Sequence, residues 1–260
     1  MHNPFAALPA SIPPIAMQIY VAVMFLLVVC GTLVDLAHKG SAKYFFKHRR
    51  IASFGARRRV AAGETAALAA KTIVVSVLAA GEFCGMLRRV THLLTMYGFV
   101  LYVVTTAVMV FAYPTAAAPG PPIVPELWYL GAVLVCVGGL WFWLLQRVDV
   151  VAEGRSPLRL VRADLFVLSL LASAAFALIW GGFQASGDHA WANASFGLYL
   201  LSNTVLFGSV PWSKFAHMFY KPAAALQRRI EHANGFRANL PAPADRPAAF
   251  GSARRQPHNY

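Results

Sequence analysis

The chain has 260 residues, of which 58% are hydrophobic and only 13% are charged, and its mean hydropathy is +0.55. Soluble domains carry roughly twice that share of charged residues, so the composition excludes an ordinary soluble protein and indicates a membrane protein. In a membrane protein the formal net charge of +13 is expected to be divided unevenly between the two sides of the membrane. We expect no nucleic-acid partner. No basic region precedes the first apolar run, so we expect no cleaved signal.

Long apolar runs predict an all-α membrane protein built as a bundle of five transmembrane helices. A spanning helix needs roughly 20 predominantly apolar residues. Four runs satisfy this requirement easily, and a fifth is more polar but long enough. The predicted spans are about 14–36, 90–113, 126–147, 164–185 and 194–218. Trp and Tyr residues lie near several of their ends, as in the aromatic belts of membrane interfaces.

The basic residues predict the orientation of these spans. Segment 36–63 carries eight Lys and Arg and no acid, whereas segments 1–13, 114–125 and 186–193 contain no Lys or Arg. Cytoplasmic loops are enriched in Lys and Arg. We therefore expect a multi-pass protein of the bacterial inner (cytoplasmic) membrane, with the N-terminus outside and the C-terminus in the cytoplasm.

Two segments are expected to lie outside the spans. Residues 37–89 form a basic cytoplasmic loop, within which Leu68–Met86 is too short and too charged at its ends for a sixth span. A helix in the cytoplasmic interface fits that segment better. The membrane domain then covers residues 1–221. Residues 222–260 form a cytoplasmic tail, with a short helix at about 222–234 that stops at Gly235, followed by an extended Pro-rich end.

Two of the eight histidines are predicted to lie at the same depth in the membrane. His92 follows Arg89 by three residues, and His217 follows Lys214 by three residues. Each lies about 4.5 Å, roughly one helical turn, from the cytoplasmic end of its span. Two such histidines on two helices are the usual axial ligands of a b-type haem in a membrane bundle. The alternative is that each is an ordinary interfacial histidine with a hydrogen-bond partner.

The neighbouring charges suit one haem with its iron between His92 and His217. The carboxylates of the haem would point toward the cytoplasm, where basic residues can pair with them; these are Arg88, Arg89, Lys214 and Lys221. His38 is the alternative ligand, although Lys39 and Gly40 suggest that the chain has left the helix there. Since no histidine lies in the outer half of a span, the sequence predicts no second haem.

Two segments carry a resemblance to a known family. They read Arg-Val-Thr-His-Leu-Leu-Thr-Met-Tyr-Gly-Phe at 89–99 and Ser-Lys-Phe-Ala-His-Met-Phe-Tyr-Lys-Pro at 213–222. Both resemble the nitrate-reductase gamma-subunit-like cytochrome b group. The small size and the tail at 239–245 are most similar to membrane anchors associated with dissimilatory adenylylsulfate reductase. The resemblance implies five spans and His92 and His217 as ligands of one haem b. Tyr102 and Tyr199 stand in the deeper regions, where that group has a second histidine pair.

These observations predict a membrane anchor and electron-transfer subunit. A cytoplasmic iron–sulfur and flavin oxidoreductase would dock on the basic inner face and pass electrons through haem b to membrane quinone. Anionic lipid would bind the same cations. The chain shows no catalytic constellation for sulfur chemistry, and the sequence locates no quinone pocket. The alternatives are a haem-free anchor, a cytochrome b subunit of another respiratory complex, and a small transporter, which the lack of a mid-membrane carboxylate disfavours.

Overall fold

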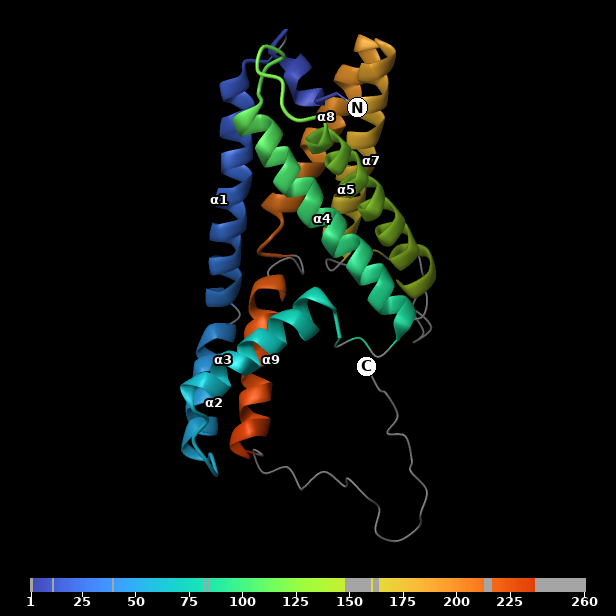
Figure 1. Ribbon diagram of the computed structural model, residues 1–260. Coiled ribbons are helices and arrows are strands. Elements are labelled where there is room, and N and C mark those ends of the chain that lie inside the picture. The colour runs from blue at the N-terminus through green and yellow to red at the C-terminus, as the bar shows by residue number, and fades with distance from the viewer. Residues whose placement is uncertain are drawn as a thin grey trace. The chain divides into compact units, whose positions relative to one another are not determined.

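A computed structural model describes residues 2–10, 12–38, 40–81, 83, 85–147, 160, 164–212 and 217–236. Within these ranges every regular element is a helix (Figure 1). The chain divides into two compact units. The bundle unit comprises Met1–Lys39 with Met86–His217, and the small unit comprises Gly40–Gly85 with Met218–Tyr260. The all-helical class predicted from the sequence is confirmed.

Four helices of the bundle unit are long and apolar enough to cross a membrane. They are α1 (Pro14–His38), α4 (Met86–Ala112), α5 (Ile123–Trp141) with its π-helical continuation η3 (Phe142–Gln146), and α7 (Asp164–Ser186). The 25 residues of α1 extend about 37 Å, which exceeds the roughly 30 Å of a hydrocarbon core. Four of the predicted spans thus correspond to helices that could cross a membrane, with ends that differ by at most four residues. The predicted count of five spans is not confirmed.

The helix that corresponds to the fifth predicted span has different bounds. Helix α8 runs from His189 to Gly208, after Asp188 caps its first turn by accepting a hydrogen bond from the Trp191 amide at 3.2 Å. It does not reach the apolarity of the other four. The chain turns after Gly208, where the Trp212 amide bonds to the Ser209 carbonyl at 2.9 Å. His217 therefore begins a later helix instead of ending this one.

Close helix contacts at small residues hold the bundle unit together. Helices α4 and α5 run side by side, as do α7 and α8 (Figure 1). A Cβ added to Gly98 would lie 2.8 Å from Leu134 Cβ, and one added to Gly131 would lie 2.7 Å from the Tyr102 nitrogen. Glycine is required at both positions because the two backbones approach so closely. Helix α1 packs on α8, and Gly31 of α1 lies against Val210 in the turn after α8.

The N-terminal residues close one end of the bundle unit. The short 3₁₀ helix η1 (Pro4–Ala10) places Phe5 against Trp128 of α5 and Trp180 of α7, with ring centroids 5.8 and 5.1 Å apart. Gln184 of α7 donates a hydrogen bond to the Pro4 carbonyl at 2.9 Å. The first residues are thus an integral part of the bundle.

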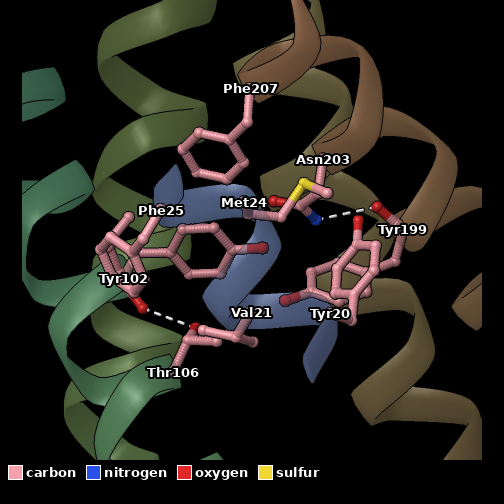
Figure 2. Close-up of a pocket in the computed structure, with 10 residues that line it drawn as sticks. Tyr20, Val21, Met24, Phe25, Tyr102, Thr106, Tyr199, Asn203 and Phe207 are labelled. Atoms are coloured by element: carbon pink, nitrogen blue, oxygen red, sulfur yellow. Dashed lines mark hydrogen bonds between the residues drawn. The ribbon is translucent and has the colours of Figure 1, made fainter. Parts of the chain in front are cut away.

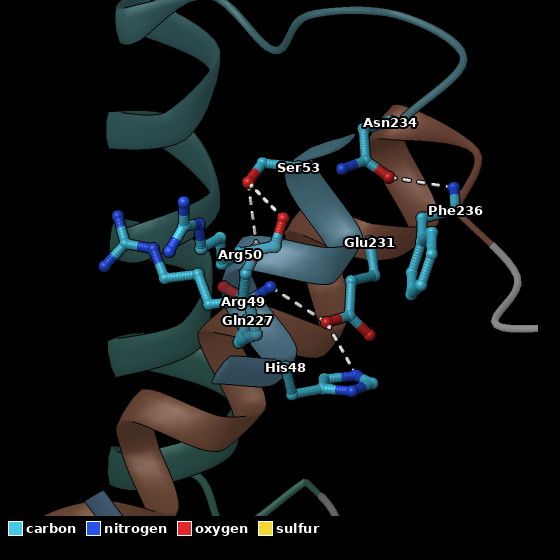
Figure 3. A network of polar contacts seen from close by, with 8 residues as sticks. All are labelled: His48, Arg49, Arg50, Ser53, Gln227, Glu231, Asn234 and Phe236. Carbon is cyan, nitrogen blue, oxygen red and sulfur yellow. Dashed lines mark hydrogen bonds and ion pairs between the residues drawn. The ribbon is translucent and has the colours of Figure 1, made fainter. Parts of the chain in front are cut away.

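The small unit contains α2 (Ser41–Phe54), α3 (Ala62–Lys71), the π-helix η2 (Thr72–Leu78) and α9 (His217–Asn234), whose first residue belongs to the bundle unit. Figure 3 shows Glu231 of α9 accepting a hydrogen bond from Gln227 at 2.8 Å and facing His48 of α2 at 3.3 Å. The amides of Arg57 and Arg58 donate to the Asn234 carbonyl. These contacts tie α2 and the chain after it to α9.

Two expectations for this unit are changed in detail. The segment expected as an interfacial helix at Leu68–Met86 is helical from Ala62 to Leu78, and its place at a membrane interface stays a prediction. The tail helix starts at His217, five residues before the expected start, and continues through Pro222. Proline has no backbone N–H and so removes one helical hydrogen bond, but the helix continues past Pro222 to Asn234. Gly235, with φ of 76°, ends it as predicted.

Candidate functional site

His92 is held near the Met86 end of α4 by a well-anchored helical turn. Its neighbour Thr91 is buried, donates to the Leu87 carbonyl at 2.8 Å, and accepts a hydrogen bond from Gln146 of η3 at 2.8 Å. Because Thr91 faces η3, the next residue is turned about 100° around the helix axis. His92 thus projects from a fixed backbone in a different direction.

The two faces of α4 differ in burial. The buried residues of α4 include Thr91, Gly98, Tyr102, Thr105 and Met109, and Gly98 lies directly against α5. The face that carries His92 is only half-buried, and its other members at helical spacing are Met96, Phe99 and Val103. Such a face could bind a planar apolar cofactor such as a haem. The imidazole would bind the iron, and the apolar side chains would cover part of the cofactor's ring.

The predicted basic partners of the haem are placed as follows. Arg88 is exposed and Arg89 is half-buried, both in the first turn of α4. Lys221 lies in the small unit, where its Nζ is 5.2 Å from the centre of the Phe83 ring. Lys214 lies outside the described residues. Only Arg88 and Arg89 are therefore placed on the same element as His92.

The second predicted ligand, His217, is the first residue of α9, and its side chain is outside the described part of the structure. The pairing of His92 with His217 stays a prediction. His38, the alternative ligand, is the last residue of α1, so the prediction that the chain has already left the helix there is wrong. Its side chain is exposed. Among the described residues, no three His, Cys, Asp or Glu side chains form a metal-binding group. A haem between two histidines needs no such group.

A buried ion pair beyond the end of η3 was not foreseen. Arg147 donates from Nε to Oδ1 of Asp164 at 3.0 Å and from Nη2 to Oδ2 at 2.6 Å. Its guanidinium also lies 4.1 Å from the centre of the Trp143 ring. The sequence shows both charges, but their pairing depends on how the chain between them returns. Arg147 thus joins the end of η3 to α7, and the carboxylate of Asp164 compensates its positive charge.

A second candidate site lies between α1, α4 and α8. A cavity of about 40 Å³ lies there. Its polar lining residues, drawn in Figure 2, are Tyr20, Tyr102, Thr106, Tyr199 and Asn203. All of these residues belong to the bundle unit. In the sequence, Tyr102 and Tyr199 marked only the positions where a second histidine pair would stand. The structure brings both of them to the same cavity.

Hydrogen bonds organise this cluster. The Tyr102 hydroxyl is 3.0 Å from Ser173 Oγ of α7, which donates to Asn203 Oδ1 at 3.0 Å. Asn203 donates in turn to the Tyr199 carbonyl at 2.8 Å. Tyr20 lies 2.9 Å from the Leu200 carbonyl and so joins α1 to α8. Buried polar groups in a membrane bundle are costly unless paired, and they often mark a ligand or proton site.

The chain is similar to a distant curated relative. The chain is 31% identical over 161 residues to citrate utilization protein B of Escherichia coli. The match covers 60% of this chain and 41% of that protein, so the chain spans about two fifths of the relative's length. No family profile matches the chain, and no solved structure matches it significantly.

Proposed function

We propose that this protein is a membrane anchor and haem b electron-transfer subunit that links a cytoplasmic oxidoreductase to the quinone pool. The observation that carries the proposal is the position of His92. It stands on the half-buried apolar face of a spanning helix, one turn beyond Arg88 and Arg89. An ionisable side chain placed there is a functional candidate by default.

The described residues fit a haem on the His92 side. His92 would supply one nitrogen ligand to the iron, Met96 and Phe99 would pack against the haem, and Arg88 and Arg89 would pair with its carboxylates. Gln146 fixes the turn through Thr91. His217 is the proposed second ligand. Haem b, when bound, carries one electron at a time between two oxidation states of its iron.

The proposed docking site for the soluble partner is the exposed basic surface of α2. Lys43, Lys47, Arg49 and Arg50 are exposed, and α2 contains no acidic residue. An acidic partner would be steered to such a surface, and its association would slow as salt is added. The same cations would bind anionic lipid headgroups. The orientation that puts α2 in the bacterial cytoplasm rests on the distribution of Lys and Arg.

The proposed partner is an adenylylsulfate reductase that works in the oxidative direction. Sulfite and AMP would combine to adenylylsulfate with the release of two electrons, and quinone would take up two electrons and two protons to give quinol. The sulfur chemistry belongs to the soluble partner. This chain supplies the attachment and the route for the electrons.

The comparison favours a second candidate partner. The relative is named for citrate utilization, so the same anchor would serve a soluble oxidoreductase of citrate utilisation. The two candidates share the haem and the quinone and differ only in the enzyme that docks. Identification of the soluble subunits that copurify with this chain distinguishes them: one candidate predicts AMP-dependent sulfite oxidation in the purified complex, and the other predicts none.

A difference spectrum tests the core of the proposal. The protein, purified from cells with ample haem, is expected to show b-type Soret and alpha bands when the reduced and oxidised spectra are subtracted. A colourless preparation would overturn the haem assignment and leave a haem-free anchor.

A further inference from the structure

We propose that the cavity between α1, α4 and α8 binds the single-ring headgroup of a membrane quinone. The inference rests on the electron-transfer role proposed above, and it names the place where the electron acceptor binds. The cavity is defined by its polar residues Tyr20, Tyr102, Thr106, Tyr199 and Asn203 (Figure 2).

The inner wall of the cavity can bind a carbonyl oxygen. Tyr102, Tyr199 and Asn203 are only 2%, 3% and 5% exposed. A carboxamide carries two N–H groups, and the Tyr199 carbonyl accepts one of those of Asn203. Asn203 also forms a side-chain hydrogen bond with the Tyr102 hydroxyl, so a ligand carbonyl would accept a hydrogen bond from Asn203 or Tyr102 in place of this contact. Because the Asn203 oxygen is held by Ser173 at 3.0 Å, the orientation of the amide is set before the ligand arrives.

The cavity has apolar walls that suit a flat ring with an isoprenoid tail. Val21 and Met24 of α1 are buried beside it, while Phe25 at its rim is 47% exposed. In a bilayer this flank of α1 faces lipid, since its residues Leu26 and Val29 are also more than half exposed. A quinone dissolved in the membrane would thus enter sideways, and its tail would stay in the lipid.

The cavity has room for one quinone ring. About 40 Å³ is room for roughly three waters, which together fill about 90 Å³ of liquid. An unsubstituted six-membered ring with two carbonyls displaces a comparable volume, so the ring substituents and the tail of a membrane quinone would lie at the open rim beside Phe25.

The cavity and His92 lie on the same helix. Ten residues separate His92 from Tyr102, which places the two about 15 Å apart along the axis of α4. Thr106 lies one further turn along and also lines the cavity. A haem at His92 and a ring at Tyr102 would thus be carried by one rigid element, without a moving part between them.

A binding titration tests the site without relying on the haem. The full chain, in nanodiscs of phosphatidylcholine, is titrated with decylbenzoquinone while tryptophan fluorescence is followed. Trp180 stacks on Tyr199 at 5.5 Å and Trp128 on Tyr102 at 5.7 Å between ring centroids, so a quinone in the cavity would quench both. Saturable quenching is expected for the wild type.

Asn203→Leu is expected to raise the apparent Kd at least tenfold, because it removes the amide and fills space. Asn193→Leu is the matched control, since Asn193 is an exposed residue of the same helix, and its Kd should equal that of the wild type. If Asn203→Leu fails to fold, Val103→Trp serves instead: Val103 is a half-buried lining residue, and the larger ring would block the cavity.

The outcomes separate this site from the proposed function. Unchanged affinity in Asn203→Leu or Val103→Trp, or no saturable quenching in the wild type, overturns the site even when the haem spectrum is present. Saturable quenching that these variants weaken supports the site. If that quenching occurs in a protein without haem, the site stands and the haem assignment falls.

Discussion

Arg147 and Asp164 form a two-bond ion pair that joins the end of η3 to the start of α7, with the two residues each only 9% exposed. Seventeen positions separate them in the chain. A charge pair with so little exposure is costly to break, because the remaining partner is left without compensation.

Loss of one partner of this pair should therefore destabilise the bundle unit. Asp164→Asn is expected to lower the free energy of unfolding by about 3 kcal/mol, measured by thermal denaturation in detergent with circular dichroism. The double variant Arg147→Met, Asp164→Leu removes both charges and should recover most of the loss. Equal melting temperatures for Asp164→Asn and the wild type would contradict the prediction.

The proposed haem ligands are tested by two single substitutions. His92→Ala and His217→Ala should each abolish the b-type difference spectrum while leaving membrane insertion intact, because one imidazole cannot supply both axial bonds. His189→Ala is the control: His189 begins α8 and is exposed, and its variant should keep the full spectrum. A low-spin bis-histidine spectrum in either ligand variant would point to His38 as the ligand instead.

Two glycines in different surroundings are expected to respond in opposite ways to substitution by alanine. Gly98 lies where α4 and α5 approach closely, and Gly182 of α7 lies in open space. Gly98→Ala adds a Cβ 2.8 Å from the Val135 backbone nitrogen, so the helices must separate, at a cost of about 1–3 kcal/mol. Gly182→Ala adds a Cβ with nothing within 4 Å and should stabilise α7 by roughly 0.5–1 kcal/mol. Thermal unfolding of both variants checks this pair, and a stabilised Gly98→Ala would show that the helices are not so close.

The exposed Arg58–Glu64 pair predicts a small pH effect in the small unit. Arg58 Nη1 donates to Glu64 Oε2 at 2.8 Å, and this hydrogen bond lowers the pKa of the Glu64 carboxyl. A lowered pKa in the folded state means that the contribution to stability is present at neutral pH and disappears as the pH falls through that pKa. Because the pair is solvated, the difference in melting temperature between Glu64→Gln and the wild type should be small at pH 7 and absent near pH 3. A difference that grows on acidification would contradict the assigned sign.

Local patterns carried most of the information about the fold. Spans at Pro14–His38, Met86–Ala112, Ile123–Gln146 and Asp164–Ser186 follow the apolar runs, because the length and apolarity of a spanning helix are properties of consecutive residues. The end of α8 was harder to predict. A run that stays fairly apolar through Val210 contains a turn after Gly208, and hydropathy does not register a turn.

The candidate sites also include features that the sequence predicts and features that only the tertiary structure shows. By itself the sequence predicted an all-helical membrane protein with five spans, four of which correspond to helices long and apolar enough to cross a membrane. It also showed a sharply uneven distribution of Lys and Arg, and it predicted His92 one turn into a span. Those features depend on residues close together in the chain. Only the tertiary structure decided that Arg147 pairs with Asp164, and that Tyr20, Tyr102 and Asn203 line one cavity. Such contacts depend on which faces of distant helices pack together, and periodicity within one helix does not specify the partner of each face.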